Sequence, residues 1–301
     1  MTTLSSTKGR GWYRDLPDFR DQTPATKTIT EKQKLRGVTK PVNAILKPLE
    51  TAKPLPAKLD LRHWCSTVED QGSLNSCTAN AAVGLYEYFE RRAFGKHIEG
   101  SRLFLYKATR NLLQWEGDEG AYLRSAMGAM ALFGVPPEKY WPYNEAMVNQ
   151  EPDAFLYSFA KNFQAISYYR LDTPGINRDV LLPKIKEHLS MNLPLIFGFS
   201  CYSSLDQSDE NGGCIPFPDK LEDQDGGHAV MAIGFDDKKV VTNKSKGDKT
   251  KGAFLIRNSW GKTWGEDGYG WLPYEYVLKG IADDWWAMTK AAWIDTGNFG
   301  E

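Results

Sequence analysis

The sequence contains few cysteines and histidines and no excess of charge of either sign. Among 301 residues there are four cysteines and four histidines, and 37 Lys and Arg residues nearly balance 38 Asp and Glu residues. Four cysteines are too few to hold such a chain together by disulfides, and their spacings fit no zinc-site pattern. A net charge of −1 provides no broad basic field for phosphates, which argues against nucleic acid as the main partner. We expect a protein without metal or cofactor.

Long hydrophobic runs are also absent. No stretch approaches the length of a membrane span, and the N-terminus lacks the apolar core of a secretory signal peptide. We therefore expect no membrane span, and a location in the cytoplasm or export by a route without a cleaved signal. Since 41% of the residues are hydrophobic and 13% are aromatic, the chain can still bury a substantial core.

One of the four cysteines stands at the start of a predicted helix. Apolar residues at helical spacing predict a helix from about Ser76 to Gly95: Ala79, Ala82, Val83, Tyr86 and Phe89. Cys77 then lies on the first turn, where unpaired N–H groups and the positive end of the helix dipole favour a thiolate. The alternative is a buried, inert cysteine, which is common in soluble proteins.

Two later segments favour the reactive interpretation. His228 begins an apolar, strand-like run that ends at Phe235, and Asn258 follows a second such run, Ala253 to Arg257. An asparagine placed there could orient an imidazole by accepting its second N–H.

Three sequence blocks occur in one order along the chain: Q-G-S-x-x-S-C ending at Cys77, G-H-A-V around His228, and N-S-W-G-x-x-W-G-x-x-G-Y from Asn258. Through these blocks the chain resembles the papain family of cysteine peptidases over residues 58 to 290. Two further stretches, Trp12–Arg20 and Gly134–Tyr143, resemble the compact bacterial type represented by xylellain. The resemblance implies an α+β, papain-like fold in which the active-site cleft separates a helical half from a β-barrel-like half.

Carried over position by position, the resemblance implies the catalytic roles. Cys77 matches the nucleophile, His228 the general base and acid, and Asn258 the residue that orients the imidazole. Gln71 matches the side-chain donor of the oxyanion hole. Trp260 matches the indole that shields the histidine–asparagine hydrogen bond, although ordinary aromatic packing explains such a residue equally well.

The same alignment implies a set of substrate-binding positions. They are Gly120, Ala121, Tyr122, Leu123, Gly198, Gly227 and Trp264. Ala121 replaces one glycine of a family pair that binds extended peptide, while Tyr122 and Leu123 would form the wall of a side-chain pocket. Gly226 would help to keep this pocket roomy, and Asp283 or Asp284 could lie near its base and admit a basic side chain.

The sequence departs from the family beside the nucleophile. Leu74 and Asn75 stand where most members have Cys-Gly, so the usual disulfide cannot form there, and we expect Cys65 to be a free, buried thiol. Without that disulfide, the rigidity of the loop between Gln71 and Cys77 is in doubt. Cys201 and Cys214 flank a turn-rich segment that could close as a hairpin, with or without a disulfide.

Residues 1–57 differ from the rest in being rich in Thr, Lys and Pro. We interpret them as an extended lead-in, followed by a peptidase domain at 58–301 with a helical half at 58–165 and a β-rich half at 166–301. Part of the lead-in, about Gly11 to Arg20, is expected to lie across or beside the cleft as an intramolecular inhibitor. The alternative is a disordered tail.

The leading functional hypothesis is a cysteine endopeptidase that acts on peptides or proteins. One alternative is a non-catalytic binding protein on a peptidase scaffold. A second is an acyltransferase or amidase that uses the same cysteine chemistry on another substrate.

Overall fold

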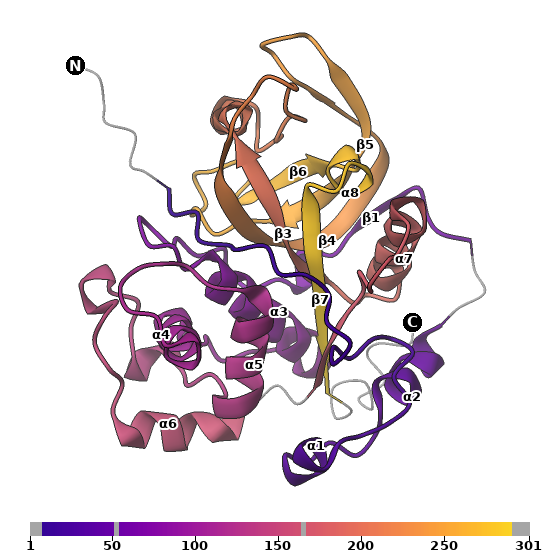
Figure 1. The fold of residues 1–301 in the computed structure, drawn as a ribbon. Coiled ribbons are helices and arrows are strands. Elements are labelled where there is room, and N and C mark those ends of the chain that lie inside the picture. Colours follow the sequence, from indigo (N-terminus) through magenta and orange to yellow (C-terminus); the bar gives the residue numbers. More distant parts are fainter. Residues whose placement is uncertain (1–7, 51–53, 164–166, 291–301) are drawn as a thin grey trace.

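A helical half and a β-sheet half lie side by side in the computed structural model, which describes residues 8–50, 54–163 and 167–290 (Figure 1). The α-helices are α1 (Glu31–Leu35), α2 (Val42–Leu46), α3 (Cys77–Phe94), α4 (Arg102–Leu113), α5 (Leu123–Phe133), α6 (Ala154–Ala160), α7 (Arg178–Ser190) and α8 (Glu275–Leu278). The 3₁₀ helices are η1 (Lys47–Leu49), η2 (Arg62–Trp64), η3 (Glu138–Tyr140), η4 (Glu145–Met147), η5 (Lys161–Phe163) and η6 (Ser203–Glu210). This is the α+β arrangement that the sequence predicted.

The sheet half is built from antiparallel pairs. Its strands are β1 (Lys58–Asp60), β2 (Ser167–Arg170), β3 (Leu195–Tyr202), β4 (Gln224–Thr242), β5 (Lys249–Arg257), β6 (Tyr269–Pro273) and β7 (Ala282–Thr289). They are hydrogen-bonded in the order β2-β7-β3-β4-β5-β6, and β1 pairs with β4. The first strand of the predicted helical half therefore belongs to the sheet. The last strand, β7, ends at Thr289, and residues 291–301 lie outside the described residues.

Helix α3 is the central element between the two halves. It packs on α4 and α5 on one side and on β4 on the other, and it is buried along most of its length. Its predicted bounds are confirmed, because the helix ends at Gly95, whose left-handed φ of 70° suits glycine and lets its N–H bond to Arg91. Cys77 is thus held on the first turn of a fixed helix.

The segment between Cys201 and Cys214 does not form the hairpin that its turn-rich sequence allowed. Residues 203–210 form the 3₁₀ helix η6, and both cysteines are free and buried. Side chains of Ser, Asp and Asn in this stretch favour local turns over a strand ladder, which explains the difference. Cys65 is free and buried, as expected.

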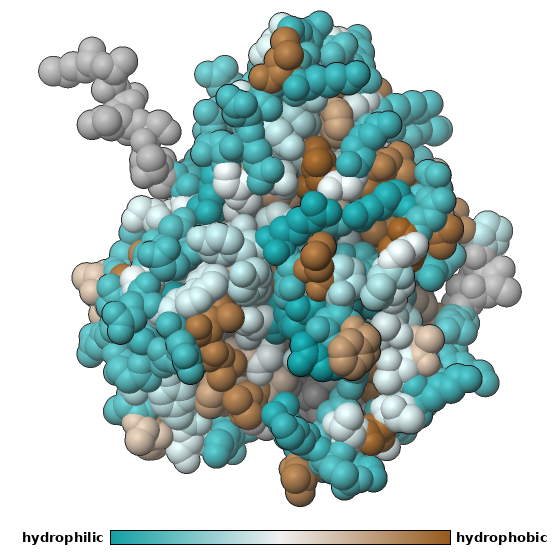
Figure 2. Space-filling model, viewed as in Figure 1, coloured by the Kyte–Doolittle hydropathy of each residue, from teal (hydrophilic) through white to brown (hydrophobic). Residues whose placement is uncertain are grey.

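The N-terminal segment runs along the junction of the two halves before it turns away into α1 and α2 (Figure 1). On this face, hydrophilic side chains follow the junction and separate apolar patches flank it (Figure 2). The apolar cluster of α2 is packed rather than tail-like, since Val42, Ile45 and Leu46 are buried. In the described ranges, no helix combines the length and apolarity needed to cross a membrane.

Candidate active site

The three predicted catalytic residues come together at the junction of the halves. Cys77 begins α3, His228 lies on β4, and Asn258 directly follows β5; none is more than 2% exposed. His228 Nε2 lies 2.7 Å from Asn258 Oδ1. Helix α3, which Cys77 begins, packs on β4. Burial raises the pKa of the Cys77 thiol, and the backbone N–H of Ala229, the residue after His228, acts to lower that pKa because it favours the thiolate form. The cysteine from the helical half therefore lies against the strand that carries the histidine.

One tryptophan covers the histidine and a second packs against the first. Trp260 stacks on the His228 imidazole with ring centroids 4.5 Å apart and an interplanar angle of 22°. Trp264 packs edge-on against Trp260 at 5.5 Å, and its indole N–H donates to Ser208 Oγ. Since water is excluded from this face, the hydrogen bond between His228 and Asn258 lies in a low-dielectric environment that strengthens it.

Gln71 has a fixed amide orientation. Ser259 Oγ donates to Gln71 Oε1 at 2.6 Å, so the Nε2 group points the other way. Gln71 Nε2 donates to the carbonyl oxygens of Leu74 and Gly9, at 2.7 and 3.1 Å. A carbonyl of the N-terminal segment thus already occupies the donor that the sequence assigned to an oxyanion hole.

The backbone of residues 9–13 pairs with both walls of the cleft. Ala121 N donates to Gly11 O at 2.8 Å, and Ala121 O accepts from Tyr13 N at 3.2 Å. On the opposite wall, Gly227 O accepts from Trp12 N at 3.0 Å. A Cβ on Gly120 would lie 2.2 Å from Gly11 O, so this wall requires glycine for the close approach.

The Trp12 side chain fills the predicted side-chain pocket. A Cβ on either Gly198 or Gly227 would overlap its indole ring, and Trp12 is only 5% exposed. The indole N–H donates to Asp284 Oδ2 at 3.1 Å. Asp284 does lie at the base of the pocket, and its carboxylate is also paired with Arg170 Nη1 at 3.1 Å.

Two of the remaining predicted pocket residues lie beside the segment. Tyr122 packs on Tyr13 and on Trp115, with ring centroids 5.9 and 5.4 Å apart. Leu123 is fully buried at the start of α5, and a Cβ on Gly226 would lie 3.8 Å from the Cβ of Arg10. Tyr122 and Gly226 therefore lie beside the segment, and Leu123 belongs to the buried core.

Ion pairs fix the segment along its length. Lys8 pairs with Asp209, Arg10 with Asp225 and Asp206, Arg14 with Asp283 at 2.5 Å, and Asp15 and Asp21 with Arg124. Most of these pairs are partly exposed, so each contributes little alone. Together they set the register of a segment whose main apolar contact is made by Trp12.

Burial changes the pKa values of Cys77 and His228. It raises the pKa of the Cys77 thiol to about 11, although backbone N–H groups of Ala229 and Gly11 partly oppose this. It lowers the pKa of His228 to about 4, although the hydrogen bond to Asn258 acts in the other direction. With the segment in place, the pair is therefore a neutral thiol and a neutral imidazole near pH 7.

Sequence reasoning missed Asn75 and Asp118. Asn75 Oδ1 accepts from the backbone N–H of Arg10 at 3.0 Å, so Asn75 contacts the segment directly. The Asp118 carboxylate accepts from the backbone N–H of Asn75. The substitution at position 75 was visible as a departure from the family pattern, but the role of position 118 had no local signal.

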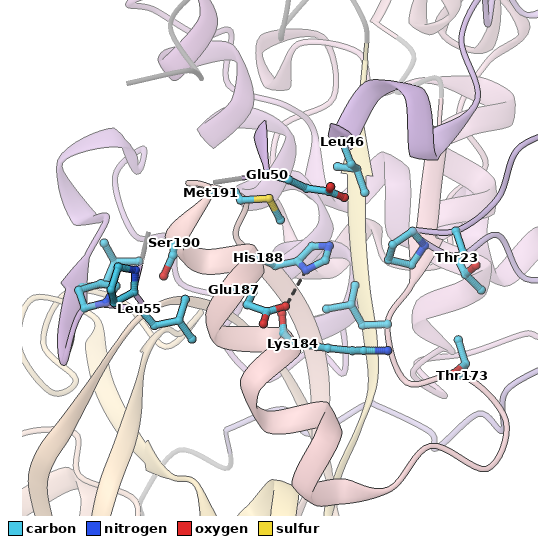
Figure 3. Close-up of a pocket in the computed structure, with 16 residues that line it drawn as sticks. Thr23, Leu46, Glu50, Leu55, Thr173, Lys184, Glu187, His188, Ser190 and Met191 are labelled. Atoms are coloured by element: carbon cyan, nitrogen blue, oxygen red, sulfur yellow. Dashed lines mark hydrogen bonds between the residues drawn. The ribbon is translucent and has the colours of Figure 1, made fainter. Parts of the chain in front are cut away.

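Another pocket lies outside the cleft. It has a volume of about 740 Å³ and is lined by residues 23–25, by residues around Leu46 and Leu55, and by α7, including His188 (Figure 3). His188 Nδ1 lies 3.1 Å from Lys184 O, and burial lowers the pKa of His188 to about 4. No residue that the sequence assigned to catalysis or substrate binding lines this pocket, so His228 is the histidine relevant to the cleft.

Comparisons with known proteins agree with this geometry. The sequence model of the family described as papain family cysteine protease matches residues 55–287. An uncharacterised peptidase C1-like protein of Acanthamoeba polyphaga mimivirus is 31% identical over 99% of this chain and 92% of its own length.

Solved structures give the same relationship. Xylellain, a cysteine protease from Xylella fastidiosa, is 30% identical, with a TM-score of 0.69 over 96% of this chain and 99% of that protein. Procathepsin L 3 from the larval midgut of Tenebrio molitor shares the fold, with a TM-score of 0.58 and 21% identity over 80% of this chain and 72% of that one.

Proposed function

The chain belongs to the papain family of cysteine proteases, and we propose that it is an endopeptidase whose cleft is closed by its own N-terminal segment. The observation that carries the proposal is the arrangement of Cys77, His228 and Asn258. The buried 2.7 Å contact between His228 Nε2 and Asn258 Oδ1 orients the imidazole and leaves its Nδ1 without a hydrogen-bond partner, and Cys77 begins the helix that packs on the strand carrying His228. That arrangement can generate and use a thiolate nucleophile.

In the proposed mechanism, Cys77 and His228 act as a thiolate–imidazolium pair once the segment has left. The Cys77 sulfur attacks the scissile carbonyl carbon, and charge develops on the carbonyl oxygen. The Gln71 amide and the backbone N–H of Cys77 donate to that oxygen. His228 then protonates the leaving amine, and water hydrolyses the thioester to release the acid and restore the thiol.

The docked segment indicates how a peptide would bind. We propose that a substrate uses the backbone groups of Ala121 and Gly227 that now pair with residues 11–13. Its side chain would enter the pocket that Trp12 now fills, next to the Asp284 carboxylate. This favours large aromatic side chains that carry a hydrogen-bond donor, or basic side chains, over small apolar ones.

Closure by the segment follows from the same contacts. Gly9 O occupies the Gln71 donor and Trp12 occupies the pocket, so a peptide cannot use either while the segment is docked. This supports the hypothesis that the chain is a zymogen, and it argues against a disordered tail for residues 8–20.

Product analysis tests the function against its alternatives. The Trp12→Ala chain, in which docking of the segment does not limit access to the cleft, is incubated with folded proteins and with peptide mixtures, and the products are analysed by mass spectrometry. New internal N- and C-termini are expected for an endopeptidase. A modified acceptor without new termini would indicate acyl transfer, and binding without any product would support the non-catalytic scaffold.

Replacing Gln71 with alanine is expected to reduce kcat by about 100- to 1,000-fold without abolishing turnover, because one of two oxyanion donors is lost. The measurement is steady-state hydrolysis of a peptide that the product analysis identifies, compared with alkylation of Cys77 by iodoacetamide. Alkylation does not need the oxyanion hole, so its rate should not fall with kcat. Equal loss of both rates would show instead that the substitution disrupts the thiolate.

A further inference from the structure

The loop that carries Gln71 is held by a polar network. We refer to residues 71–76 as the oxyanion loop. It lacks the cysteine with which a disulfide beside the nucleophile would be formed, because Leu74 and Asn75 occupy that position. Its backbone nevertheless must stay fixed, since Gln71 and the N-terminus of α3 define where a carbonyl oxygen can bind.

Asp118 contacts the middle of the oxyanion loop. Its two carboxylate oxygens each lie 3.0 Å from the backbone N–H nitrogen of Asn75. Its backbone carbonyl accepts from Asn75 Nδ2 at 2.8 Å. Main chain and side chain of Asn75 are therefore both bound by one residue that lies 43 positions later in the sequence.

Tyr106 extends this network to the peptide-binding wall. Its hydroxyl donates to Asp118 Oδ1 at 2.6 Å and accepts from the backbone N–H of Gly120 at 2.9 Å. Tyr106 is fully buried on α4. A continuous set of hydrogen bonds thus joins Asn75, behind the oxyanion hole, to Gly120, next to the Ala121 groups that pair with a peptide backbone.

The two ends of the oxyanion loop have a different support. Tyr143 OH donates to Gln71 O at 2.8 Å and shares a 2.7 Å hydrogen bond with Ser76 Oγ. The buried Arg102 guanidinium lies over the Tyr143 ring, 4.3 Å from its centroid. Between these ends, the half-buried Asp118 holds Asn75, Gln71 Nε2 binds Leu74 O within the loop, and the exposed Glu145 accepts from Ser73.

We propose that Asp118 is a positioning residue which, with Tyr106, ties the oxyanion loop to the peptide-binding wall in place of a disulfide. The inference rests on the proposed peptidase function. A carboxylate suits this position because both of its oxygens accept, so it can serve the Asn75 N–H and the Tyr106 hydroxyl together. The active-site loop would then keep its shape under reducing conditions, where a disulfide would open.

The test uses the full-length chain with Trp12→Ala as the parent, so that docking of the segment does not limit the assay. Asp118→Asn keeps the size and shape of the side chain. It replaces one carboxylate oxygen by an NH₂ group, which then faces either the Asn75 N–H or the Tyr106 hydroxyl, both of them donors. A loss of one charged hydrogen bond predicts about a 10- to 100-fold fall in kcat with little change in KM. Tyr106→Phe should produce a smaller fall of the same kind, and Glu116→Gln, which changes another acid of the same loop, should produce none.

A peptide aldehyde and iodoacetamide separate positioning from general structure. The aldehyde forms a tetrahedral adduct that needs the oxyanion hole, so its affinity should fall in parallel with kcat, while iodoacetamide should alkylate Cys77 at the parent rate. Unchanged kcat in both variants contradicts the proposal, as does a parallel loss of alkylation and of thermal stability. A parent that alkylates but cleaves no peptide would contradict the peptidase function itself.

Discussion

Replacing Trp12 with alanine is expected to raise the rate at which iodoacetamide alkylates Cys77 at pH 7 by about 100- to 4,000-fold. Truncating a buried tryptophan to alanine destabilises the packed state by about 3 to 5 kcal/mol. Each 1.4 kcal/mol changes the equilibrium between the docked and undocked states about tenfold. The cost falls on the docked state alone, because the indole contacts Asp284, Gly198 and Gly227 only when the segment lies in the cleft. Intact mass and peptide mapping measure the rate at Cys77.

Phe19→Ala is the matched control, since Phe19 lies in the same segment but is 91% exposed. It should leave the alkylation rate at the level of the unmodified chain. If Trp12→Ala labelled no faster than Phe19→Ala, the segment would not control access to Cys77, and the zymogen hypothesis would be wrong.

The pH dependence of alkylation should differ between the two states. In the docked state the pKa of Cys77 is raised to about 11, so the thiolate is scarce at pH 7 and labelling increases as the solution becomes more alkaline. Burial also lowers the pKa of His228 from 6.5 to about 4, and we expect the docked segment to provide part of that burial. The docked state is therefore favoured above pH 6.5 and loses that advantage as the pH falls towards 4. Acid should open the cleft of the unmodified chain.

Replacing Cys77 with alanine is expected to reduce peptide hydrolysis by about 10⁵-fold or more, because the covalent route is lost altogether. His228, Asn258 and Gln71 remain, yet none of them supplies a nucleophile to attack the carbonyl carbon. The measurement is hydrolysis by the Trp12→Ala chain with and without the second substitution.

The matched control is Cys65→Ala, which removes another buried thiol. Cys65 Sγ contacts Leu61 O outside the cleft, so this variant should retain full activity. Substantial turnover in the Cys77→Ala variant would mean that another group, or a contaminating enzyme, performs the hydrolysis.

Much of the cleft could be predicted from the sequence because its determinants are local. The spacing of apolar residues predicted α3, and Gly95 predicted its end. The apolar runs before Asn258 and after His228 predicted the strands that position these side chains. Local pattern was enough to place each residue on its element, and the family resemblance supplied the way in which the elements assemble.

The parts that were missed depend on contacts between distant residues. Asp118 binds Asn75 across 43 positions, and nothing near Asp118 distinguishes it from a solvated acid. The packing of Trp12 on Gly198 and Gly227 joins residues that are far apart in the sequence. The stretch 202–213 was misjudged for a local reason. Its turn-forming residues suit a 3₁₀ helix as well as a hairpin, so the local pattern did not distinguish the two.

The pocket that Trp12 fills has a consequence for how such a protein can diverge. A mutation that gives Gly198 or Gly227 a side chain would narrow the pocket and would also displace the Trp12 indole, which we propose closes the cleft. A mutation that changes substrate preference would therefore also weaken docking of the N-terminal segment, unless residue 12 changed as well. Lineages of this protein should accordingly show paired substitutions at position 12 and at the two pocket glycines.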